Sequence, residues 1–278
     1  MNHPKVAVIT GASSGIGKYT AIGLAKQGYE VILLVRDSEK SRQALQDIQQ
    51  AAGSSAVHLI YVDLSSMASV RQAAAQIQER YAQIDLLINN AGVYKRTEEI
   101  ASDGFEMTIA VNYLAPFFLT QLLLPALKQA GQARIVNLSS ELYKRGKPSW
   151  DERFGLASFD GNQAYANSKL LLNFFTISLA KEVAADGISV FAVHPGVIGT
   201  DVFREFPAWF QRLLLLFIPS PEKGAKPSLY LATAEGIEAQ SGSYFKKTSL
   251  QKPNSLEKDE ALIAKVKQQT QILLEAVL

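Results

Sequence analysis

Short apolar runs alternate with longer segments of helical spacing along the first two thirds of the chain. The apolar runs are rich in Val, Ile and Leu, and they cover residues 6–9, 30–35, 57–62, 84–88, 133–138 and 188–193. The segments between them repeat apolar residues three and four positions apart, which predicts helices over residues 16–27, 38–52, 66–81, 104–128 and 163–185. This alternation is typical of βαβ units, and uninterrupted apolar strands indicate a parallel sheet with both faces covered. We therefore predict an α/β fold with a doubly wound parallel sheet of about seven strands and helices on both faces.

The last third of the chain continues the pattern more weakly. It predicts a short strand over residues 243–245 and helices over residues 207–218, 222–233 and 258–277. No internal repeat, low-complexity tract or linker interrupts residues 1–278, so we predict a single domain. Within it, the polar loop over residues 141–162 and the segment over residues 201–220 are expected to wall a substrate pocket. The most apolar stretch, residues 206–218, is too short for a transmembrane helix, which needs about 20 residues.

Composition narrows the classes of function. The chain has no Cys and only three His, which excludes disulfides and thiolate nucleophiles and argues against a metal site. The net charge of +2 is too small and too scattered to favour nucleic-acid binding. The first predicted strand begins within a few residues of Met1, which leaves no room for a signal peptide. From these features we expect a cytoplasmic protein with no metal, no nucleic-acid partner and no transmembrane segment.

A glycine-rich turn follows the first predicted strand. Residues 5–17 read KVAVITGASSGIG, and Gly11, Gly15 and Gly17 lie where the strand passes into a helix. Glycine permits a tight turn and the close approach of a ligand, and the N-terminus of the helix offers free N–H groups to a pyrophosphate. A tight turn without a ligand would use the same residues. The strand–turn–helix context favours the binding of a dinucleotide.

Other polar residues come at the ends of further predicted strands. Arg36, Asp63, Asn90 and Ser140 each lie within two residues of such an end. Ligands of doubly wound sheets bind beyond the carboxyl ends of the strands. We therefore expect these four side chains at one edge of the sheet, beside the glycine-rich turn.

Tyr165 and Lys169 lie four residues apart on the helix predicted over residues 163–185. This spacing places both side chains on one helix face. A nearby ammonium favours the phenolate, so Lys169 is expected to lower the pKa of Tyr165 from about 10 and to let it exchange a proton near neutral pH. An ordinary packed helix with a snorkelling lysine would show the same spacing. Ser140, Asn112 and the glycine-rich turn are expected at the same sheet edge, which favours the chemical interpretation.

These motifs together resemble those of the short-chain dehydrogenase/reductase family, whose single domain is a Rossmann fold. Residues 10–17, TGASSGIG, match its T-G-x-x-x-G-x-G motif, and residues 89–92 match its N-N-A-G motif. Residues 195–200 match its P-G-x-x-x-T motif. The catalytic tetrad of the family is matched by Asn112, Ser140, Tyr165 and Lys169. Flanking residues, such as DGFEM before Asn112, resemble the retinol dehydrogenase branch.

The resemblance implies a role for each tetrad residue. Tyr165 would donate or accept the proton at the substrate oxygen, and Ser140 would hydrogen-bond that oxygen. Lys169 would lower the pKa of the tyrosine and bind the nicotinamide ribose. Asn112 would hold a water molecule against Lys169; the alternative is a helix-bending polar residue that the backbone satisfies.

The resemblance also implies a set of cofactor-binding residues. These are Gly11, Ser13, Ser14, Gly15, Ile16, Gly17, Arg36, Asp63, Leu64, Asn90, Ala91, Gly92, Tyr165, Lys169, Pro195, Gly196, Val197 and Thr200. Among them, Asp63 would contact the adenine with Leu64 packed beside it. Residues 195–197 and Thr200 would fix the carboxamide of the nicotinamide.

The end of the second predicted strand decides the cofactor. An acidic residue there would bind the ribose hydroxyls of NAD, whereas an arginine accommodates the 2′-phosphate of NADP. Arg36 follows the strand directly and Asp37 comes next, and an arginine side chain suits a phosphate because its donors are planar and bidentate. Lys18 and Lys40 could add positive charge, while a merely solvated Arg36 is the alternative. We predict NADP(H) rather than NAD(H).

The substrate is read from the two pocket segments. These segments contain the aromatic residues Tyr143, Trp150, Phe154, Phe159, Trp209 and Phe210. Such residues indicate that the substrate is an apolar and fairly bulky alcohol, aldehyde or ketone. Alternatively, the leucines of residues 213–217 form a packed or oligomer-facing stripe, and the resemblance itself implies a homo-oligomer. A non-catalytic dinucleotide sensor on the same fold is the competing function. It predicts a damaged tetrad, whereas all four positions are intact.

Overall fold

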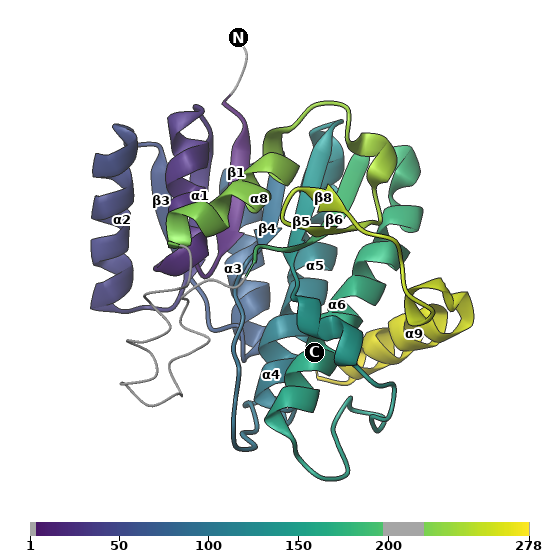
Figure 1. The fold of residues 1–278 in the computed structure, drawn as a ribbon. Helices are drawn as coiled ribbons and strands as arrows, with labels where there is room; N and C mark the ends of the chain where they lie inside the picture. Colours follow the sequence, from purple (N-terminus) through teal and green to yellow (C-terminus); the bar gives the residue numbers. More distant parts are fainter. Residues whose placement is uncertain (1–3, 197–219, 278) are drawn as a thin grey trace.

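The computed structural model describes residues 4–196 and 220–277. Its centre is an eight-stranded sheet with the strand order β3-β2-β1-β4-β5-β6-β7-β8 (Figure 1). The strands are β1 (Val6–Thr10), β2 (Glu30–Val35), β3 (Val57–Tyr61), β4 (Leu86–Asn89), β5 (Ala133–Leu138), β6 (Ile188–His194), β7 (Tyr244–Lys246) and β8 (Ser249–Leu250). Strands β1 to β7 pair in parallel, and only β8 is antiparallel to its neighbour. The predicted doubly wound parallel sheet is thus confirmed.

The strand count exceeds the predicted seven because of β8. This strand has two residues, and it pairs with β7 through a tight turn in which Lys247 has a φ of 57°. Two residues are too few for an alternating pattern to appear in a sequence. The difference does not alter the parallel part of the sheet.

Two layers of helices cover the sheet, as the alternation of strand side chains requires. In β1, Ala7 and Ile9 pack in one apolar cluster, with α1 (Gly15–Lys26), α2 (Glu39–Ala52) and α8 (Pro221–Thr233). Val6 and Val8 pack in the opposite cluster, beneath the second layer of helices. That layer consists of α3 (Met67–Arg80), α5 (Ala115–Gln129), α6 (Gly161–Glu182) and α9 (Glu260–Ala276) (Figure 1).

The helix predicted over residues 104–128 has a different start and an irregular turn. Gly104 has a φ of 77°, and Ile100 pairs with Glu106 in an isolated bridge, so the chain is not helical before α4 (Met107–Ile109). The Glu106 carboxylate caps α4 by accepting hydrogen bonds from the backbone N–H groups of Thr108 and Ile109. A π-helical turn, η1 (Ala110–Leu114), then joins α4 to α5. The shift has a local cause, since a capping carboxylate and a positive φ outweigh the apolar spacing.

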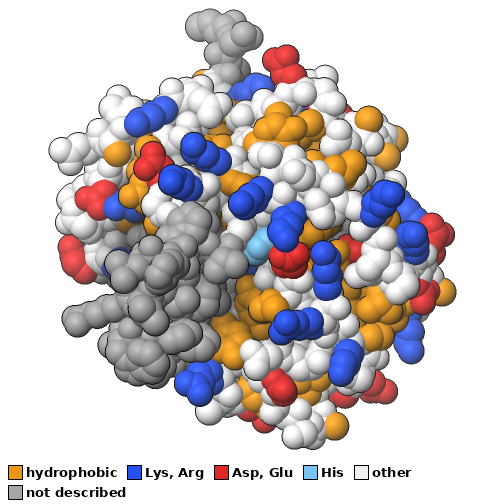
Figure 2. All heavy atoms as spheres, viewed as in Figure 1, with side chains coloured by type: hydrophobic (Ala, Val, Ile, Leu, Met, Phe, Trp, Pro, Cys, Tyr) orange, Lys and Arg blue, Asp and Glu red, His pale blue; other side chains and the backbone are white. Residues whose placement is uncertain are grey.

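This helical stretch is also the one region of the described residues with the length and hydropathy of a membrane span. Within residues 107–129, an 18-residue window has a mean hydropathy of 1.5, but 83% of that window is buried within the fold. A core helix under a sheet has the same composition. On the face of the molecule that Figure 2 shows, Lys and Arg side chains are interspersed with Asp and Glu.

Residues 4–196 and 220–277 also hold four 3₁₀ helices: η2 (Glu141–Arg145), η3 (Ala184–Asp186), η5 (Glu238–Gln240) and η6 (Leu256–Lys258). The first of these lies within the predicted polar loop over residues 141–162. The close contact of this loop with α6 depends on Gly146, where a β-carbon would lie 2.8 Å from the Cβ of Leu170.

A row of buried polar side chains crosses the middle of the sheet. Asn89 of β4 and Asn137 of β5 are register partners, and the Nδ2 of Asn89 donates to the Oδ1 of Asn137 at 2.8 Å. Asn137 in turn donates to Thr176 of α6, and Asn89 donates to Thr120 of α5. The row therefore ties two central strands to the two long helices that cover them.

Candidate active site

The carboxyl ends of the parallel strands bring most of the predicted site residues to one edge of the sheet. The glycine-rich turn follows β1, Arg36 follows β2, Asp63 lies beyond β3, and Asn90 follows β4. Ser140 lies two residues beyond β5, and residues 195–196 follow β6. Val197 and Thr200, together with the pocket segment over residues 201–219, lie outside the described residues.

The turn after β1 is locked to the turn after β4. The side-chain amide of Asn90 donates to the carbonyl oxygens of Thr10 and Gly11, at 2.7 and 3.2 Å. The hydroxyl of Thr10 accepts hydrogen bonds from the backbone N–H groups of Asn90 and Ala91. The approach is close enough to require glycine, since a β-carbon on Gly17 would lie 2.4 Å from the Asn90 Nδ2. Asn90 therefore shapes the dinucleotide turn through its own hydrogen bonds.

The start of α1 has the chemistry of an anion site. Gly11 and Gly15 have φ values of 68° and 56°, which turn the chain sharply before the helix begins. The first turn of α1 holds no acidic side chain, so nothing there opposes the positive potential of the helix N-terminus. Ser13, Ser14 and Ile16 belong to the same turn. These residues fit the pyrophosphate of a dinucleotide.

Tyr165 and Ser140 meet at this edge. Tyr165 lies on the first turns of α6, which begins at Gly161 with Asp160 as its N-cap. Ser140 lies close enough to the Tyr165 hydroxyl to act on its pKa, and 8% of the Tyr165 surface remains exposed. Ser140 also accepts a hydrogen bond from the backbone N–H of Leu142 at 3.3 Å, so its hydroxyl caps η2. The two hydroxyls expected at the substrate oxygen are thus neighbours at this edge.

Lys169 lies one helical turn beyond Tyr165, with its Nζ 5.7 Å from the centre of the tyrosine ring. The ammonium is 3% exposed and donates to the carbonyl oxygen of Leu138 at 2.8 Å. The turn after β4 passes beside it, because a β-carbon on Gly92 would lie 3.4 Å from the Lys169 Nζ. The side chain therefore reaches from α6 to the turn that follows β4.

The predicted lowering of the tyrosine pKa is wrong in direction. Burial raises the pKa of Tyr165 to about 12, although the hydrogen bond with Ser140 acts to lower it. Burial also lowers the pKa of Lys169 to about 7, because the ammonium is withdrawn from water. A partly neutral lysine bonded to a carbonyl oxygen exerts less attraction on a phenolate than the spacing alone suggests. Tyr165 consequently holds its proton at neutral pH.

Asn112 lies in the middle of the π-helical turn and is fully buried. Its Oδ1 accepts from the backbone N–H of Val93 at 2.7 Å, and its Nδ2 donates to the Val93 carbonyl oxygen at 2.9 Å. The Nδ2 also donates to the hydroxyl of Ser168, the neighbour of Lys169. This arrangement supports the interpretation in which the backbone satisfies the amide. Asn112 thereby fixes the chain just after the N-N-A-G motif.

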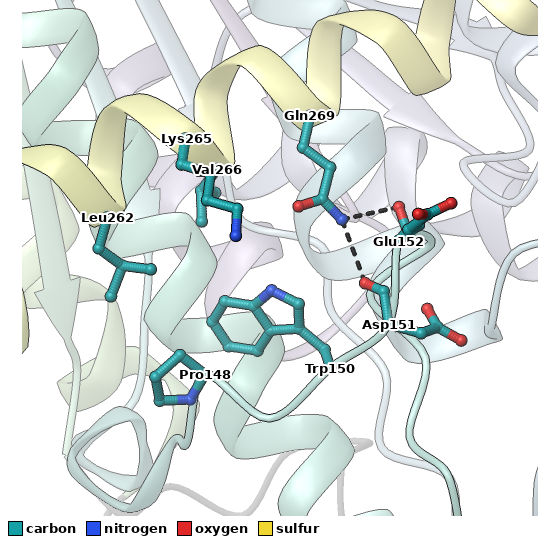
Figure 3. Close-up of a pocket in the computed structure, with 8 residues that line it drawn as sticks. All are labelled: Pro148, Trp150, Asp151, Glu152, Leu262, Lys265, Val266 and Gln269. Carbon is teal, nitrogen blue, oxygen red and sulfur yellow. Dashed lines mark hydrogen bonds between the residues drawn. The ribbon is translucent and has the colours of Figure 1, made fainter.

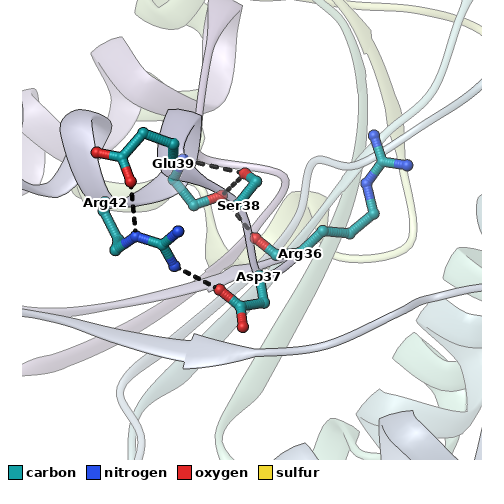
Figure 4. Close-up of polar contacts among 6 residues, drawn as sticks. Arg36, Asp37, Ser38, Glu39 and Arg42 are labelled. Atoms are coloured by element: carbon teal, nitrogen blue, oxygen red, sulfur yellow. Dashed lines mark hydrogen bonds and ion pairs between the residues drawn. The ribbon is translucent and has the colours of Figure 1, made fainter.

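Arg36 extends away from the acidic residues near it. Figure 4 shows its guanidinium pointing away from Asp37, whose carboxylate is paired with Arg42 at 2.6 Å. Arg42 also binds Glu39 at 3.0 Å, and the Arg36 carbonyl oxygen accepts from the Ser41 hydroxyl at 2.6 Å. The backbone of Arg36 is thus held while its side chain projects outward. Lys18, which could have added charge here, is paired with Asp47.

The predicted adenine contacts lie at the end of β3. One carboxylate oxygen of Asp63 accepts from both the backbone N–H and the hydroxyl of Ser65, at 2.9 and 2.7 Å. Leu64 is half-buried and packs against the core. The backbone of Asp63 is held by the Ser69 hydroxyl at 2.9 Å. The carboxylate is therefore oriented by its own turn.

Most aromatic residues of the predicted pocket loop pack elsewhere. Phe154 is 1% exposed and its ring contacts those of Tyr113 and Trp150. Trp150 lines a cavity of about 350 Å³ against α9, with Leu262 and Val266 opposite (Figure 3). The ring of Tyr143, from η2, packs against Tyr244 of β7. These contacts place Trp150, Phe154 and Tyr143 in the body of the fold, which corrects the prediction that they wall the substrate pocket.

Tyr94 is an aromatic residue of the site that the sequence patterns missed. Its ring lies 5.8 Å from that of Tyr165 in an edge-on arrangement, and its hydroxyl donates to Asn162 at 3.1 Å. The start of α6 packs directly on this segment, since a β-carbon on Gly161 would lie 2.1 Å from the Lys95 carbonyl oxygen. Only the position of Tyr94 shortly after the N-N-A-G motif could have pointed to it.

The family model for short chain dehydrogenases matches residues 5–211 of this chain. The chain belongs to the short-chain dehydrogenase family. It is 41% identical to retinol dehydrogenase 11 of Mus musculus over 243 residues, which cover 87% of this chain and 77% of that protein. It is 40% identical to retinol dehydrogenase 13 of Homo sapiens over 250 residues, covering 87% and 76% of the two chains. The resemblance to the retinol dehydrogenase branch is confirmed.

Solved structures share the fold of this chain. A protein from Mycobacterium paratuberculosis aligns with a TM-score of 0.77 at 28% identity, covering 98% of this chain and 93% of its own. A provisionally named NAD(P)-dependent gluconate 5-dehydrogenase from Beutenbergia cavernae, with NADP bound at low occupancy, aligns with a TM-score of 0.71 at 25% identity. That alignment covers 87% of this chain and 94% of the other. Membership of this family makes the chain an oxidoreductase that uses a nicotinamide dinucleotide.

Proposed function

We propose that the protein interconverts an alcohol and a carbonyl group on an apolar, fairly bulky substrate, with NADP(H) as its cofactor. The observation that carries the proposal is the meeting of Tyr165 with Ser140, one helical turn from Lys169 and beside the dinucleotide turn. When bound, the dinucleotide supplies or accepts the hydride. The protein supplies the proton, the orientation and the electrostatic stabilisation.

Each residue has a task that its surroundings support. The Tyr165 phenol, whose pKa is raised to about 12, is protonated at neutral pH and can donate to the oxygen of a carbonyl substrate. Ser140 donates a hydrogen bond to the same oxygen and stabilises the charge that develops there. Lys169, whose ammonium donates to the Leu138 carbonyl oxygen, would also hold the nicotinamide ribose. Asn112 keeps the neighbouring turn in place through its bonds to Val93.

The charges around Arg36 support NADP(H) over NAD(H). The Asp37 carboxylate, which would repel a phosphate, is neutralised by Arg42. The Arg36 guanidinium is exposed and projects from the end of β2. A ribose 2′-phosphate would therefore meet one unopposed arginine there.

Kinetics with a panel of apolar aldehydes and ketones tests the proposal, with nicotinamide absorbance as the readout. We expect turnover with NADPH and a kcat/KM for NADPH about tenfold or more above that for NADH. Arg36→Ala should lose most of this preference, whereas Arg80→Ala, at an exposed position on α3, should keep it. A clear preference for NADH would overturn the cofactor assignment.

Tyr165→Phe separates catalysis from binding. The variant should lose most turnover while its NADPH affinity stays within about twofold of the wild type, because the hydroxyl acts on the substrate. A fully active variant would overturn the assignment of Tyr165. Tight NADPH binding by the wild type without turnover across the panel would favour a dinucleotide sensor.

A further inference from the structure

Glu257 is a buried carboxylate far along the chain from the four tetrad residues. It lies in η6 and is 6% exposed. Its Oε2 accepts from the Tyr143 hydroxyl at 3.0 Å and from the backbone N–H of Asn254 at 2.9 Å, and its Oε1 accepts from the Asn173 amide at 3.2 Å. A buried carboxylate is tolerated only when hydrogen bonds replace its water shell. These three donors are neutral and all point to this one group.

The side-chain donors come from the two elements that carry the chemistry. Tyr143 lies in η2, three residues after Ser140, which caps that helix. Asn173 lies on α6, four residues after Lys169 and so on the same face of the helix. The Glu257 carboxylate thereby joins η2, which Ser140 caps, to α6, the helix that carries Tyr165 and Lys169.

Neighbouring contacts make this junction stiff. The backbone N–H of Glu257 donates to the Asn254 side chain at 2.9 Å, which completes a reciprocal pair of hydrogen bonds and fixes the carboxylate. The Tyr143 ring is 1% exposed, with its centre 4.6 Å from that of Tyr244. Gly146 allows η2 to rest directly on Leu170 of α6. The separation of η2 and α6 is thus determined by packing and by the Glu257 hydrogen bonds together.

We propose that Glu257 is a positioning residue for the reaction, which sets the placement of Ser140 relative to Tyr165 by tying η2 to α6. The proposal rests on the proposed function, because it assigns a catalytic consequence to this contact. Displacement of a catalytic group by about 1 Å costs on the order of a hundredfold in rate. Loss of the Glu257 carboxylate removes hydrogen bonds that help to set this placement, and none of them involves the dinucleotide turn after β1.

Variants of Glu257 test the proposal against a matched control. We expect Glu257→Ala to lower kcat by about a hundredfold and Glu257→Gln, which keeps the shape and one acceptor, by about tenfold. The NADPH dissociation constant should stay within about twofold of the wild type. The control is Glu260→Gln, which removes the same charge and a contact to the same helix, the exposed ion pair with Lys181. Its kcat should be unchanged.

A double-variant cycle distinguishes positioning from mere stability. If Glu257 acts through Ser140, the double variant of Glu257→Ala with Ser140→Ala will be no slower than Ser140→Ala alone. The pH at which alcohol oxidation reaches half its maximum should also rise in Glu257→Ala, as in Ser140→Ala, since the hydrogen bond that lowers the pKa of Tyr165 is lost. Should Glu257→Ala fail to fold, Glu257→Gln and Tyr143→Phe are tested in the same cycle.

Two outcomes would overturn the inference. The first is a lowered melting temperature with kcat and the pH profile unchanged, and the second is additive losses in the double variant. Either result leaves the proposed function intact, because wild-type turnover is measured in the same experiment. A wild type that binds NADPH but turns over none of the panel would instead overturn the proposed function, and this inference with it.

Discussion

The Nζ atom of Lys169 lies 2.8 Å from the carbonyl oxygen of Leu138, the last residue of β5. The lysine thereby bridges α6 and the central strand whose continuation carries Ser140. Because the ammonium is buried, its pKa falls from 10.5 to about 7. This shift predicts a measurable dependence of stability on pH.

Between pH 7 and about pH 10, the unfolded chain holds a proton on Lys169 that the folded chain has released. The free energy of unfolding should therefore rise with pH through this window, by up to about 1.4 kcal/mol per pH unit from this group. Below pH 7 both states hold the proton, and the contribution is constant. Urea unfolding of the wild type and of Lys169→Met at pH 6 to 10 measures the difference. If the free energy of unfolding changed with pH in the same way in both proteins, the lowered pKa of Lys169 would be contradicted.

Ser140 and Ser139 provide a natural pair of variants. Ser140→Ala removes the hydroxyl proposed to bind the substrate oxygen beside Tyr165, so kcat should fall by about a hundredfold while the NADPH affinity is retained. The hydroxyl of Ser139 is buried and has no hydrogen-bond partner among the described residues. Ser139→Ala therefore removes no bond and should stay within about twofold of the wild type. Equal losses in both variants would show that the site was assigned to the wrong serine.

Gly17→Ala tests the contact between the two turns. Its β-carbon would lie 2.4 Å from the Asn90 Nδ2 and 2.7 Å from the Gly11 carbonyl oxygen, so the turns must separate. Such overpacking costs about 1–3 kcal/mol, and we expect NADPH to bind about tenfold or more weakly by titration of its fluorescence.

The matched control for this experiment is Gly23→Ala on the same helix. Its β-carbon would meet only the flexible end of Leu229, at 2.6 Å. This variant should lower the melting temperature slightly and leave NADPH binding unchanged. Weakened binding in both variants would point to a general loss of packing in α1.

Arg42 offers a test of the charge balance beside Arg36. Arg42→Ala leaves the Asp37 carboxylate without its partner, so the kcat/KM for NADPH should fall relative to that for NADH. The pair is exposed to solvent, which screens its charges and limits the change to about fivefold. Arg42→Ala combined with Asp37→Asn should restore the wild-type preference, because the repelling charge is then absent. Persistence of the loss would mean that Arg42 binds the phosphate itself.

The sequence patterns succeeded where a local rule applies to consecutive residues. Uninterrupted apolar strands such as residues 31–35 indicated the parallel sheet, and the spacing of Tyr165 and Lys169 placed both on one face of α6. The carboxyl ends of the strands then brought Arg36 and Ser140 to the predicted edge. These are consequences of helix and strand geometry alone.

The parts that could not be predicted depend on contacts between distant segments. The π-helical turn around Asn112 depends on Val93 and Ser168, and Glu257 meets Tyr143 only in the folded chain. The direction of the Tyr165 pKa shift follows from burial, which the spacing to Lys169 does not reveal. The sequence predicted that Trp150 and Phe154 line the substrate pocket because they are apolar residues of a loop. In the fold they pack against each other, and Trp150 also faces α9.

The paired amides of Asn89 and Asn137 have a consequence for alignment during folding. Side chains on a strand alternate between its two faces, so a slip of β4 against β5 by one residue would move the Asn89 amide into the apolar layer formed with α1 and α8. Asn89 would then be buried without a partner and Asn137 would lose its donor, at a cost of several kcal/mol. Misaligned pairings of the two central strands are thereby penalised. The levels at which Asn90 and Ser140 emerge from the sheet are thus set by one hydrogen bond at the carboxyl ends of β4 and β5.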